Sequence, residues 1–295
     1  MRASGKGGLE VARYRLVVLD MDGTLLTDDK QITPRTAAAI RAGRERGVRF
    51  VLATARPFCS ARPYAASLGL EGPLICYNGA LVREAASAAT MAARPLPPET
   101  AAEMAAFCQE RGLYMKVFGD DIFYVREPTE ETVRYAPRYH VPFRAVGDLA
   151  AFIAREGLAP YSFVVHAAPE RVPALKAEME ARWAGRIAGD CPNEHAIHFT
   201  DARASKLAAV QALAAGWGIA PEEVMAVGNG GNDLEVLLWA GLGVAVANSP
   251  AEVLARADRV TASNNEEGVA LALETHLLAG EAASPEPDLP AQKGL

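Results

Sequence analysis

One short apolar run constrains the fold of this chain more than any other feature. Residues 15–19 read RLVVL, and Asp20 follows at once. A continuous apolar run of this length is typical of a parallel strand buried on both faces. Residues 49–53 and 74–77 repeat the pattern. The segments between these runs are predicted to be helices, and the first helix covers roughly residues 34–46. This β-α-β-α-β order predicts a parallel sheet with right-handed crossovers.

The alternation of buried strands and helices is interrupted in the middle of the chain and then resumes. Between about residues 84 and 199, hairpin-like strands alternate with helices, as in a mixed α+β unit. After residue 200, buried strands separated by helices recur. We therefore predict an α/β protein with a Rossmann-like parallel-sheet core, helices on both faces of that sheet, and an inserted α+β cap domain. The predicted core is discontinuous, 13–83 and 200–279, the cap domain spans 84–199, and the Gly/Pro/Ser-rich ends, 1–12 and 280–295, are predicted to be flexible tails.

Composition narrows the classes of partner. Half of the residues are apolar and 22% are charged, which is typical of a globular protein with a real core. The formal net charge is −6 and no basic block occurs, so a nucleic-acid partner is not expected. No run approaches the roughly 20 apolar residues of a membrane span, and the N-terminal sequence lacks the apolar core of a secretory signal. We expect a soluble protein without membrane association, as a monomer or small homo-oligomer.

The cysteines indicate a compartment. Their spacing contains no C-x-x-C pair, which argues against a disulfide framework and against a thiolate zinc site. A reducing, cytoplasmic location fits best; the four residues are Cys59, Cys76, Cys108 and Cys191.

Two carboxylates follow the first strand. Asp20 and Asp22 stand in the sequence DMDGT, so one can attack phosphorus as a nucleophile while the other transfers protons. The following glycine would let the backbone turn away. Taken alone, such a sequence is also compatible with a solvated turn after a strand.

Two further segments supply groups that suit a phosphate. Thr54 ends the second strand, and with the backbone N–H of Ala55 it could bind phosphoryl oxygens at a helix start, although a helix cap is the commoner role for such a residue taken alone. Lys206 begins a predicted helix, where a cation is disfavoured unless an anion offsets the helix dipole; a solvated surface lysine is the ordinary alternative.

The loop at residues 228–233 reads GNGGND and offers oxygen ligands for Mg²⁺, a hard cation. The oxygens of Asn229 and Asp233 could converge there with Asp20 on the ion. A glycine-rich turn with capping Asn and Asp side chains is the alternative. The candidate substrate residues are Asn78 and Gly79, at the end of the third strand, and Asn232. Like the candidate metal ligands, they lie at carboxyl ends of predicted strands or at helix starts. Open α/β sheets bind their ligands at these places.

These residues resemble the motifs of the haloacid dehalogenase superfamily, and closely its Cof-type branch of sugar-phosphate phosphatases. The DMDGTLL segment at residues 20–26 resembles the first motif, Thr54 with Arg56-Pro57 the second, Ser205-Lys206 the third and residues 228–233 the fourth. The segment TASNNEEGVA, residues 261–270, resembles the closing segment of the branch. The matches extend over about residues 14–278, whereas residues 84–199 resemble the large cap of the family only in position, length and pattern.

The resemblance implies a Mg²⁺-dependent phosphatase that acts on a small phosphorylated metabolite. Asp20 would form an aspartyl-phosphate, while Asp22 would protonate the leaving alcohol and then activate water. Thr54 and Lys206 would hold the phosphoryl oxygens. Mg²⁺ would lie against the Asp20 carboxylate, the Asp22 backbone carbonyl and the fourth motif, and the cap would close over the substrate.

The chain departs from the family pattern at two positions. Asn229 stands where the fourth motif usually has an aspartate, so a charged metal ligand is replaced by a neutral amide. Ala55 stands where glycine is common, which would be strained if that position needs a positive φ. Because of Asn229, a second function stays possible, that of a protein that binds a phosphorylated ligand without turnover. A phosphomutase is a further alternative.

Other polar residues have ordinary explanations. Asp28 and Asp29 are expected to form a solvated turn. His195 and His198 lie three residues apart on a predicted strand and so should not chelate one ion. Tyr114 and Lys116 share a strand face and could touch substrate, although a partly buried strand face accounts for them as well.

Overall fold

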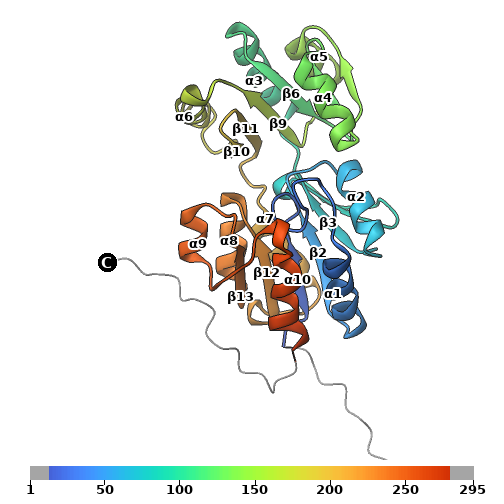
Figure 1. Ribbon diagram of the computed structural model, residues 1–295. Coiled ribbons are helices and arrows are strands. Elements are labelled where there is room, and N and C mark those ends of the chain that lie inside the picture. Colours follow the sequence, from blue (N-terminus) through green and yellow to red (C-terminus); the bar gives the residue numbers. More distant parts are fainter. Residues whose placement is uncertain (1–12, 280–295) are drawn as a thin grey trace, which may run out of the picture.

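The computed structural model describes residues 13–279 (Figure 1). The predicted tails at 1–12 and 280–295 lie outside the described residues. Two sheets organise the chain: a large sheet of eight strands and a small sheet of six. In Figure 1 the small sheet and its helices lie above the large one.

The large sheet confirms the predicted parallel core. Its strand order is β14-β13-β12-β1-β2-β3-β4-β5; the six strands from β14 to β3 are parallel, and β4 and β5 extend the edge in an antiparallel manner. The strands are β1 (Leu16–Leu19), β2 (Arg49–Ala53), β3 (Pro73–Cys76), β4 (Leu81–Glu84), β5 (Thr90–Ala93), β12 (Val224–Gly228), β13 (Leu242–Val246) and β14 (Arg259–Thr261).

Helices cover both faces of the large sheet. Side chains alternate along a strand, so Val17 and Leu19 of β1 pack on one face, in a core shared with Ile40. Leu16 and Val18 pack on the other face, in a separate core shared with residues of α7 and α8. The helices are α1 (Pro34–Glu45), α2 (Phe58–Ser67), α7 (Lys206–Gly216), α8 (Gly231–Trp239), α9 (Ala251–Arg256) and α10 (Gly268–Leu273), and a π-helical turn, Glu274–Leu278, continues α10.

The small sheet has the order β10-β11-β9-β6-β7-β8. All its pairs are antiparallel except β7 with β8. One face packs under α3, α5 and α6, around a core that includes Val117, Phe163 and Ile197. Its elements are α3 (Pro98–Glu110), β6 (Tyr114–Phe118), β7 (Phe123–Val125), α4 (Glu130–Tyr139), β8 (Phe143–Ala145), α5 (Leu149–Glu156), β9 (Ser162–His166), α6 (Val172–Arg182), β10 (Ile187–Asn193) and β11 (Ala196–Asp201). Short 3₁₀ turns lie at Tyr77–Gly79, Pro169–Arg171, Pro221–Glu223 and Asn264–Glu266.

The predicted start of the insertion needs correction. Residue 84 was expected to begin the cap, yet β5 pairs with β4 in the large sheet, so residues 84–93 belong to that sheet. The four residues of β5 are exposed and weakly apolar, and therefore carry no buried-strand pattern. At the other end β11 runs two residues past the expected boundary at 199. Within residues 13–279 no helix combines the length and apolar character needed to cross a bilayer.

Candidate active site

The predicted site residues meet at one edge of the large sheet. Asp20 follows β1, Thr54 follows β2, and the loop at 228–233 ends β12. Leu19 of β1 pairs in register with Leu52 and with Val227, so the three strands end together. Parallel register therefore brings segments far apart in the sequence to a common edge, as expected for an open α/β sheet.

A buried ion triad lies at the centre of this edge. Lys206, only 2% exposed, donates from Nζ to Asp20 Oδ1 and to Asp233 Oδ1, each at 2.7 Å. Burial and the charge of Asp233 raise the pKa of Asp20 to about 7, although Lys206 opposes the shift. Burial acts to lower the pKa of Lys206, but the two carboxylates outweigh it and hold the ammonium protonated. The Lys206 ammonium thus pairs with two carboxylates, and the triad has a surplus of negative charge.

Asp233 also orders the glycine-rich loop. Its Oδ2 accepts hydrogen bonds from the backbone N–H groups of Asn229 and Gly230, at 3.0 and 2.9 Å. With Oδ1 on Lys206, both oxygens of Asp233 are engaged by the protein. This arrangement suits a residue that orients Lys206 and the loop better than a direct metal ligand.

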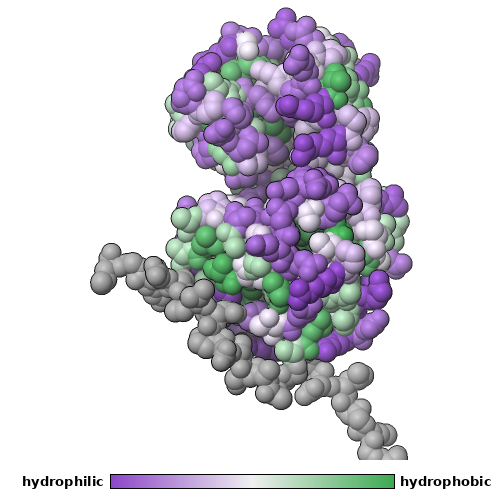
Figure 2. Space-filling view, in the orientation of Figure 1, coloured by the Kyte–Doolittle hydropathy of each residue, from purple (hydrophilic) through white to green (hydrophobic). Residues whose placement is uncertain are grey.

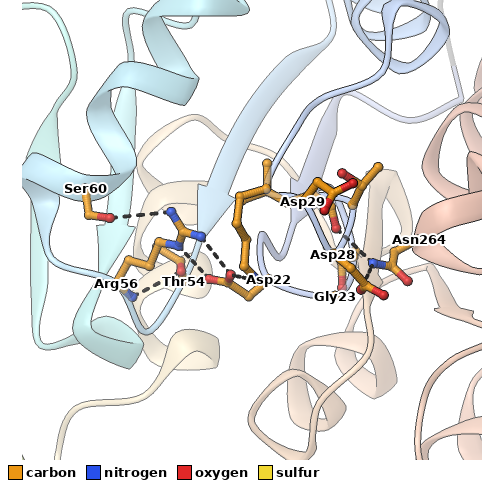
Figure 3. A network of polar contacts seen from close by, with 12 residues as sticks. Asp22, Gly23, Asp28, Asp29, Thr54, Arg56, Ser60 and Asn264 are labelled. Carbon is orange, nitrogen blue, oxygen red and sulfur yellow. Dashed lines mark hydrogen bonds and ion pairs between the residues drawn. The ribbon is translucent and has the colours of Figure 1, made fainter. Parts of the chain in front are cut away.

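Asp22 is held away from the triad by two cations. Arg56 donates from Nε and Nη2 to the two carboxylate oxygens at 2.6 and 2.7 Å, and Lys30 Nζ lies 2.9 Å from Oδ1 (Figure 3). Burial acts to raise the pKa of Asp22, but Arg56 and Lys30 outweigh it and lower the pKa to about 2. In this geometry Asp22 is an ionised acceptor, so it must leave Arg56 before it can carry a proton.

Asn229 packs against the turn that follows Asp22. Its Oδ1 accepts from Thr24 Oγ1 at 3.1 Å. Gly23 has φ +78°, and a Cβ there would come within 2.6 Å of Asn229 Nδ2, so only glycine fits. Asn248 Nδ2 fixes the same turn by donating to the Gly23 carbonyl at 2.8 Å.

The second motif shows why alanine is tolerated. Thr54 is buried, and its Oγ1 accepts from the Arg56 backbone N–H at 3.1 Å. Ala55 is not among the described residues with positive φ, so it carries no backbone strain where glycine would be common. Thr54 and Ala55 both line the cavity described below.

Two predicted substrate residues lie behind the site. Asn78 accepts from Asn232 Nδ2 at 2.9 Å, and of these two only Asn232 lines the cavity. Gly79 has φ +97°, and a Cβ there would lie 2.2 Å from the Ser205 carbonyl. Ser205 caps α7 by accepting from the Ala208 N–H, so the glycine lets this helix start approach closely. Asn78 and Gly79 therefore position Asn232 and α7 and do not face the cavity.

A cavity of about 560 Å³ opens between the two sheets. The large sheet contributes Asp20, Asp22, Thr54 and the loop at 229–232, whereas Lys206 and Asp233 lie behind Asp20 and outside the lining. In the space-filling view the molecule narrows at this level, and the visible rim is mostly hydrophilic (Figure 2). From the small sheet and α4 come Lys116, Glu131, Arg134, Tyr135, Arg138, Tyr139, Val164, His166, Asp190, Cys191, Pro192, Asn193, Ala196 and His198.

Comparison with known proteins identifies the family. The profile described as haloacid dehalogenase-like hydrolase matches residues 17–273. The chain belongs to this family. YxeH of Bacillus subtilis (strain 168), whose phosphatase activity is itself inferred, is 33% identical over 275 residues, covering 90% of this chain and 99% of its own. The pyridoxal phosphate phosphatase YbhA of Escherichia coli (strain K12) is 26% identical over 284 residues, covering 90% and 99%.

The solved structures agree. A haloacid dehalogenase-like hydrolase from Bacteroides thetaiotaomicron superimposes with a TM-score of 0.80 at 27% identity, over 89% of this chain and 99% of that one. The predicted family and its Cof-type branch are confirmed, and the chain is a phosphoric monoester hydrolase by family.

The donor set suits a weakly charged magnesium site. Within residues 13–279 no three His, Cys, Asp or Glu side chains are grouped as metal ligands. Available instead are the Asp20 carboxylate, the Asp22 backbone carbonyl and the Asn229 amide oxygen, all hard oxygen donors of the type that Mg²⁺ prefers. The surplus negative charge of Asp20 and Asp233 over Lys206 would be neutralised by a cation at this point. The residues of this hydrolase therefore fit Mg²⁺, with less charge than a carboxylate at position 229 would provide.

Sequence reasoning missed the residues on the α4 side of the cavity. Along α4, Glu131, Arg134, Tyr135, Arg138 and Tyr139 recur every three or four residues and so share one helical face. That stripe could have been read from the sequence, had the helix been predicted. Asp28, in contrast, lies as expected on a polar turn, where Asn264 and Asn265 donate to its carboxylate (Figure 3).

Proposed function

We propose that this hydrolase is a Mg²⁺-dependent phosphatase of a small phosphorylated metabolite, most simply a sugar phosphate, and that it works through an aspartyl-phosphate on Asp20. The observation that carries the proposal is the placement of Asp20 at the cavity lining, with Lys206 fixing one of its oxygens at 2.7 Å. Within the described residues only Oδ1 of Asp20 receives a hydrogen bond, which leaves Oδ2 for chemistry. The match to named phosphatases supports the same reaction class.

The reaction has two steps. Asp20 attacks phosphorus, and the bond between phosphorus and the alcohol oxygen breaks while protonated Asp22 donates its proton to that oxygen. Asp22 then takes a proton from a water molecule that attacks the acyl phosphate, which releases phosphate and restores Asp20. Binding of a phosphate dianion would draw Arg56 and Lys30 from Asp22 and so free it for this task.

The remaining groups bind and orient. The Thr54 hydroxyl and the Ala55 backbone N–H would bind phosphoryl oxygens at the start of the turn leading to α2. Lys206 keeps the Asp20 carboxylate oriented, and Asp233 keeps Lys206 in place. Mg²⁺, held by Asp20, the Asp22 carbonyl and Asn229, would supply positive charge for the transferring phosphoryl group.

The cavity supports a cap role for the small sheet and its helices. Because this body supplies the wall opposite Asp20, we propose that residues 94–201 form the cap and exclude water from the bound substrate. The four free cysteines are compatible with the reducing cytoplasm expected from the sequence.

Phosphate release from a panel of phosphomonoesters tests the proposal, with purified protein and Mg²⁺. The Asp20→Asn variant should lose activity by about 1,000-fold or more, since the nucleophile is removed. The matched variant Asp29→Asn, on an exposed turn, should retain wild-type activity. Equal activity of wild type and Asp20→Asn would refute the mechanism.

Asn229 supports one alternative, a protein that binds a phosphorylated ligand without turnover. Its signature would be thermal stabilisation of the wild type by a sugar phosphate with no phosphate released at any Mg²⁺ concentration. A phosphomutase would instead convert one phosphate isomer into another with little free phosphate.

A further inference from the structure

A row of polar side chains crosses the cavity-facing side of the small sheet. Lys116 in β6 pairs in register with Val164 in β9, Val164 with His198 in β11, and His198 with Asp190 in β10. Residues paired in register point to the same face of a sheet. All four line the cavity, so the row lies opposite the large-sheet residues of the site.

Lys116 is a buried cation with an incomplete partner. It is 2% exposed, and among the described residues its one carboxylate contact is Glu131, at 3.3 Å. Glu131 is bound more closely by the exposed Arg134, at 2.6 Å. The Nζ also lies 3.8 Å from the ring centroid of Tyr135. Burial lowers the pKa of Lys116 to about 8, which indicates that these contacts do not offset the loss of water.

Two neutral imidazoles flank this ammonium. His166 follows Val164 by two residues on the same face, and its Nε2 is the one buried side-chain nitrogen or oxygen in residues 13–279 without a hydrogen-bond partner. Burial, together with the charge of Lys116, lowers the pKa of His166 to about 4 and that of His198 to about 3. Both rings are therefore uncharged at neutral pH and can each donate one N–H.

A buried nitrogen without a hydrogen-bond partner and a buried cation with a single long ion pair both lower the stability of a folded protein. A single anion in the cavity would satisfy both at once, because it can accept from the ammonium and from the imidazole N–H groups. Neutral hydroxyl groups could hydrogen-bond to the same nitrogens but would add no negative charge to the long ion pair that Glu131 makes with Lys116. The row ends in Asp190 on the far side of His198, so the anion is expected at the Lys116 end.

Resting on the proposed function, we infer that Lys116, His166 and His198 form a subsite for a negatively charged group, a carboxylate or a second phosphate, at the end of the substrate remote from the scissile phosphate. No hydroxyl-only sugar phosphate would use this subsite fully. The inference therefore narrows the substrate class to phosphorylated acids and bisphosphates.

Helix α4 fixes the reach of such a substrate. The Tyr139 ring lies 5.0 Å from the guanidinium carbon of Arg56, which holds Asp22, and Tyr135, one turn earlier, covers Lys116. One helical turn advances about 5.4 Å. The rings that contact Arg56 and Lys116 are therefore about one turn apart along α4, and six-carbon compounds are chosen to probe the subsite on this basis.

A matched pair of compounds tests the subsite. Gluconate 6-phosphate and glucitol 6-phosphate differ only in a carboxylate or a hydroxymethyl group at the end remote from phosphate, and glucitol 1,6-bisphosphate carries a second phosphate there. Binding is measured by calorimetry on the Asp20→Asn variant with Mg²⁺, which removes turnover, and phosphate release is measured on the otherwise unchanged chain. The bisphosphate distinguishes a site that takes any anion from one that takes a carboxylate alone.

We expect the acid, the bisphosphate or both to bind about 10- to 100-fold more tightly than glucitol 6-phosphate, the range for a charge-assisted hydrogen bond. Lys116→Met should abolish this preference while binding of glucitol 6-phosphate changes by less than about threefold. Lys176→Met is the matched control, since Lys176 lies on α6, pairs with Glu180 and does not line the cavity. His166→Ala is a second, milder variant that should reduce the preference about threefold.

Three outcomes would overturn the inference: equal binding of the three compounds, a preference that survives Lys116→Met, or no binding of any of them. The thermal midpoint of Lys116→Met shows whether this variant is folded. Methionine is chosen because it suits a buried position. Failure of the proposed function has a different signature. The acid, the bisphosphate or both would then bind more tightly than glucitol 6-phosphate, as expected, yet the chain with Asp20 intact would release no phosphate.

Discussion

Replacing Asn229 by aspartate tests the metal site through two opposing effects. The change keeps the acceptor for Thr24 Oγ1, and no hydrogen bond from Asn229 Nδ2 exists in the described residues to be lost. It adds a third carboxylate beside Asp20 and Asp233, which already share one ammonium. Without metal, Asn229→Asp should therefore be less stable than the wild type.

The magnitude follows from the charges. At an effective dielectric of about 20, two like charges about 8 Å apart repel by about 2 kcal/mol, and we expect a cost of this order. For a chain of this size that corresponds to a decrease of about 4–8 °C in the thermal midpoint. With metal, a charged ligand in place of the amide should strengthen Mg²⁺ binding by about 10- to 100-fold, the range found when supporting partners of a metal site are changed.

The assay is a thermal unfolding series over Mg²⁺ concentration, followed by phosphate release over the same range. Tighter binding by 10- to 100-fold is worth about 1.4–2.8 kcal/mol, so the variant should regain the wild-type midpoint at saturating Mg²⁺. Asn193→Asp is the control: it adds the same charge to the cavity lining and keeps the acceptor for the His195 N–H. An unchanged half-saturating Mg²⁺ concentration in Asn229→Asp would refute a metal-ligand role for this position.

Two further predictions concern the residues behind Asp20. Lys206→Met leaves two buried carboxylates without their cation and should lower the free energy of unfolding by about 3–5 kcal/mol in urea titrations. Because the folded-state pKa of Asp20 is already raised to about 7, this deficit should be large at about pH 8 and shrink as the pH falls to about 5, where protonation removes the repulsion; a deficit that grows at low pH would contradict the argument. Gly79→Ala combines positive φ with a clash against the Ser205 carbonyl and should cost about 2–4 kcal/mol and most of the activity, whereas Gly112→Ala, also at positive φ but with open space around it, should cost about 1 kcal/mol and leave activity unchanged. Equal effects of the two alanines would show that the approach of α7 to Gly79 is unimportant.

The large sheet was predictable because its signals are local. Each buried strand is recognisable as a short apolar run, and parallel register alone determines where the residue that follows it lies. Asp20, Thr54 and Asn229 could therefore be brought to one edge without any knowledge of side-chain packing. The boundary at residue 84 was wrong because β5 is an exposed edge strand, whose sequence has no burial pattern to detect.

Roles that depend on distance between side chains could not be predicted. The sequence indicates that Asp233 offers an oxygen, but only the structure shows both of its oxygens bound to Lys206 and to the loop backbone. The same holds for Asn78, which was expected to face the substrate and instead orients Asn232. In both cases the residue type was informative and the direction of the side chain was not.

One contact between the large-sheet body and the small-sheet body connects the cavity to Asp22, the proposed acid and base. Arg56 holds Asp22 in its ionised form, and the same guanidinium lies against Tyr139 of α4 at 5.0 Å. Tyr139 and Tyr135 are one turn apart on α4, so the helix that contacts Arg56 also covers Lys116. On the proposed mechanism, a substrate that reached from Asp20 to Lys116 would pass along this face of α4, and its phosphate would compete with Asp22 for Arg56. Occupation of the proposed Lys116 subsite and release of Asp22 would then be linked through a single helix, so that proton transfer would be favoured when a substrate of matching length is bound.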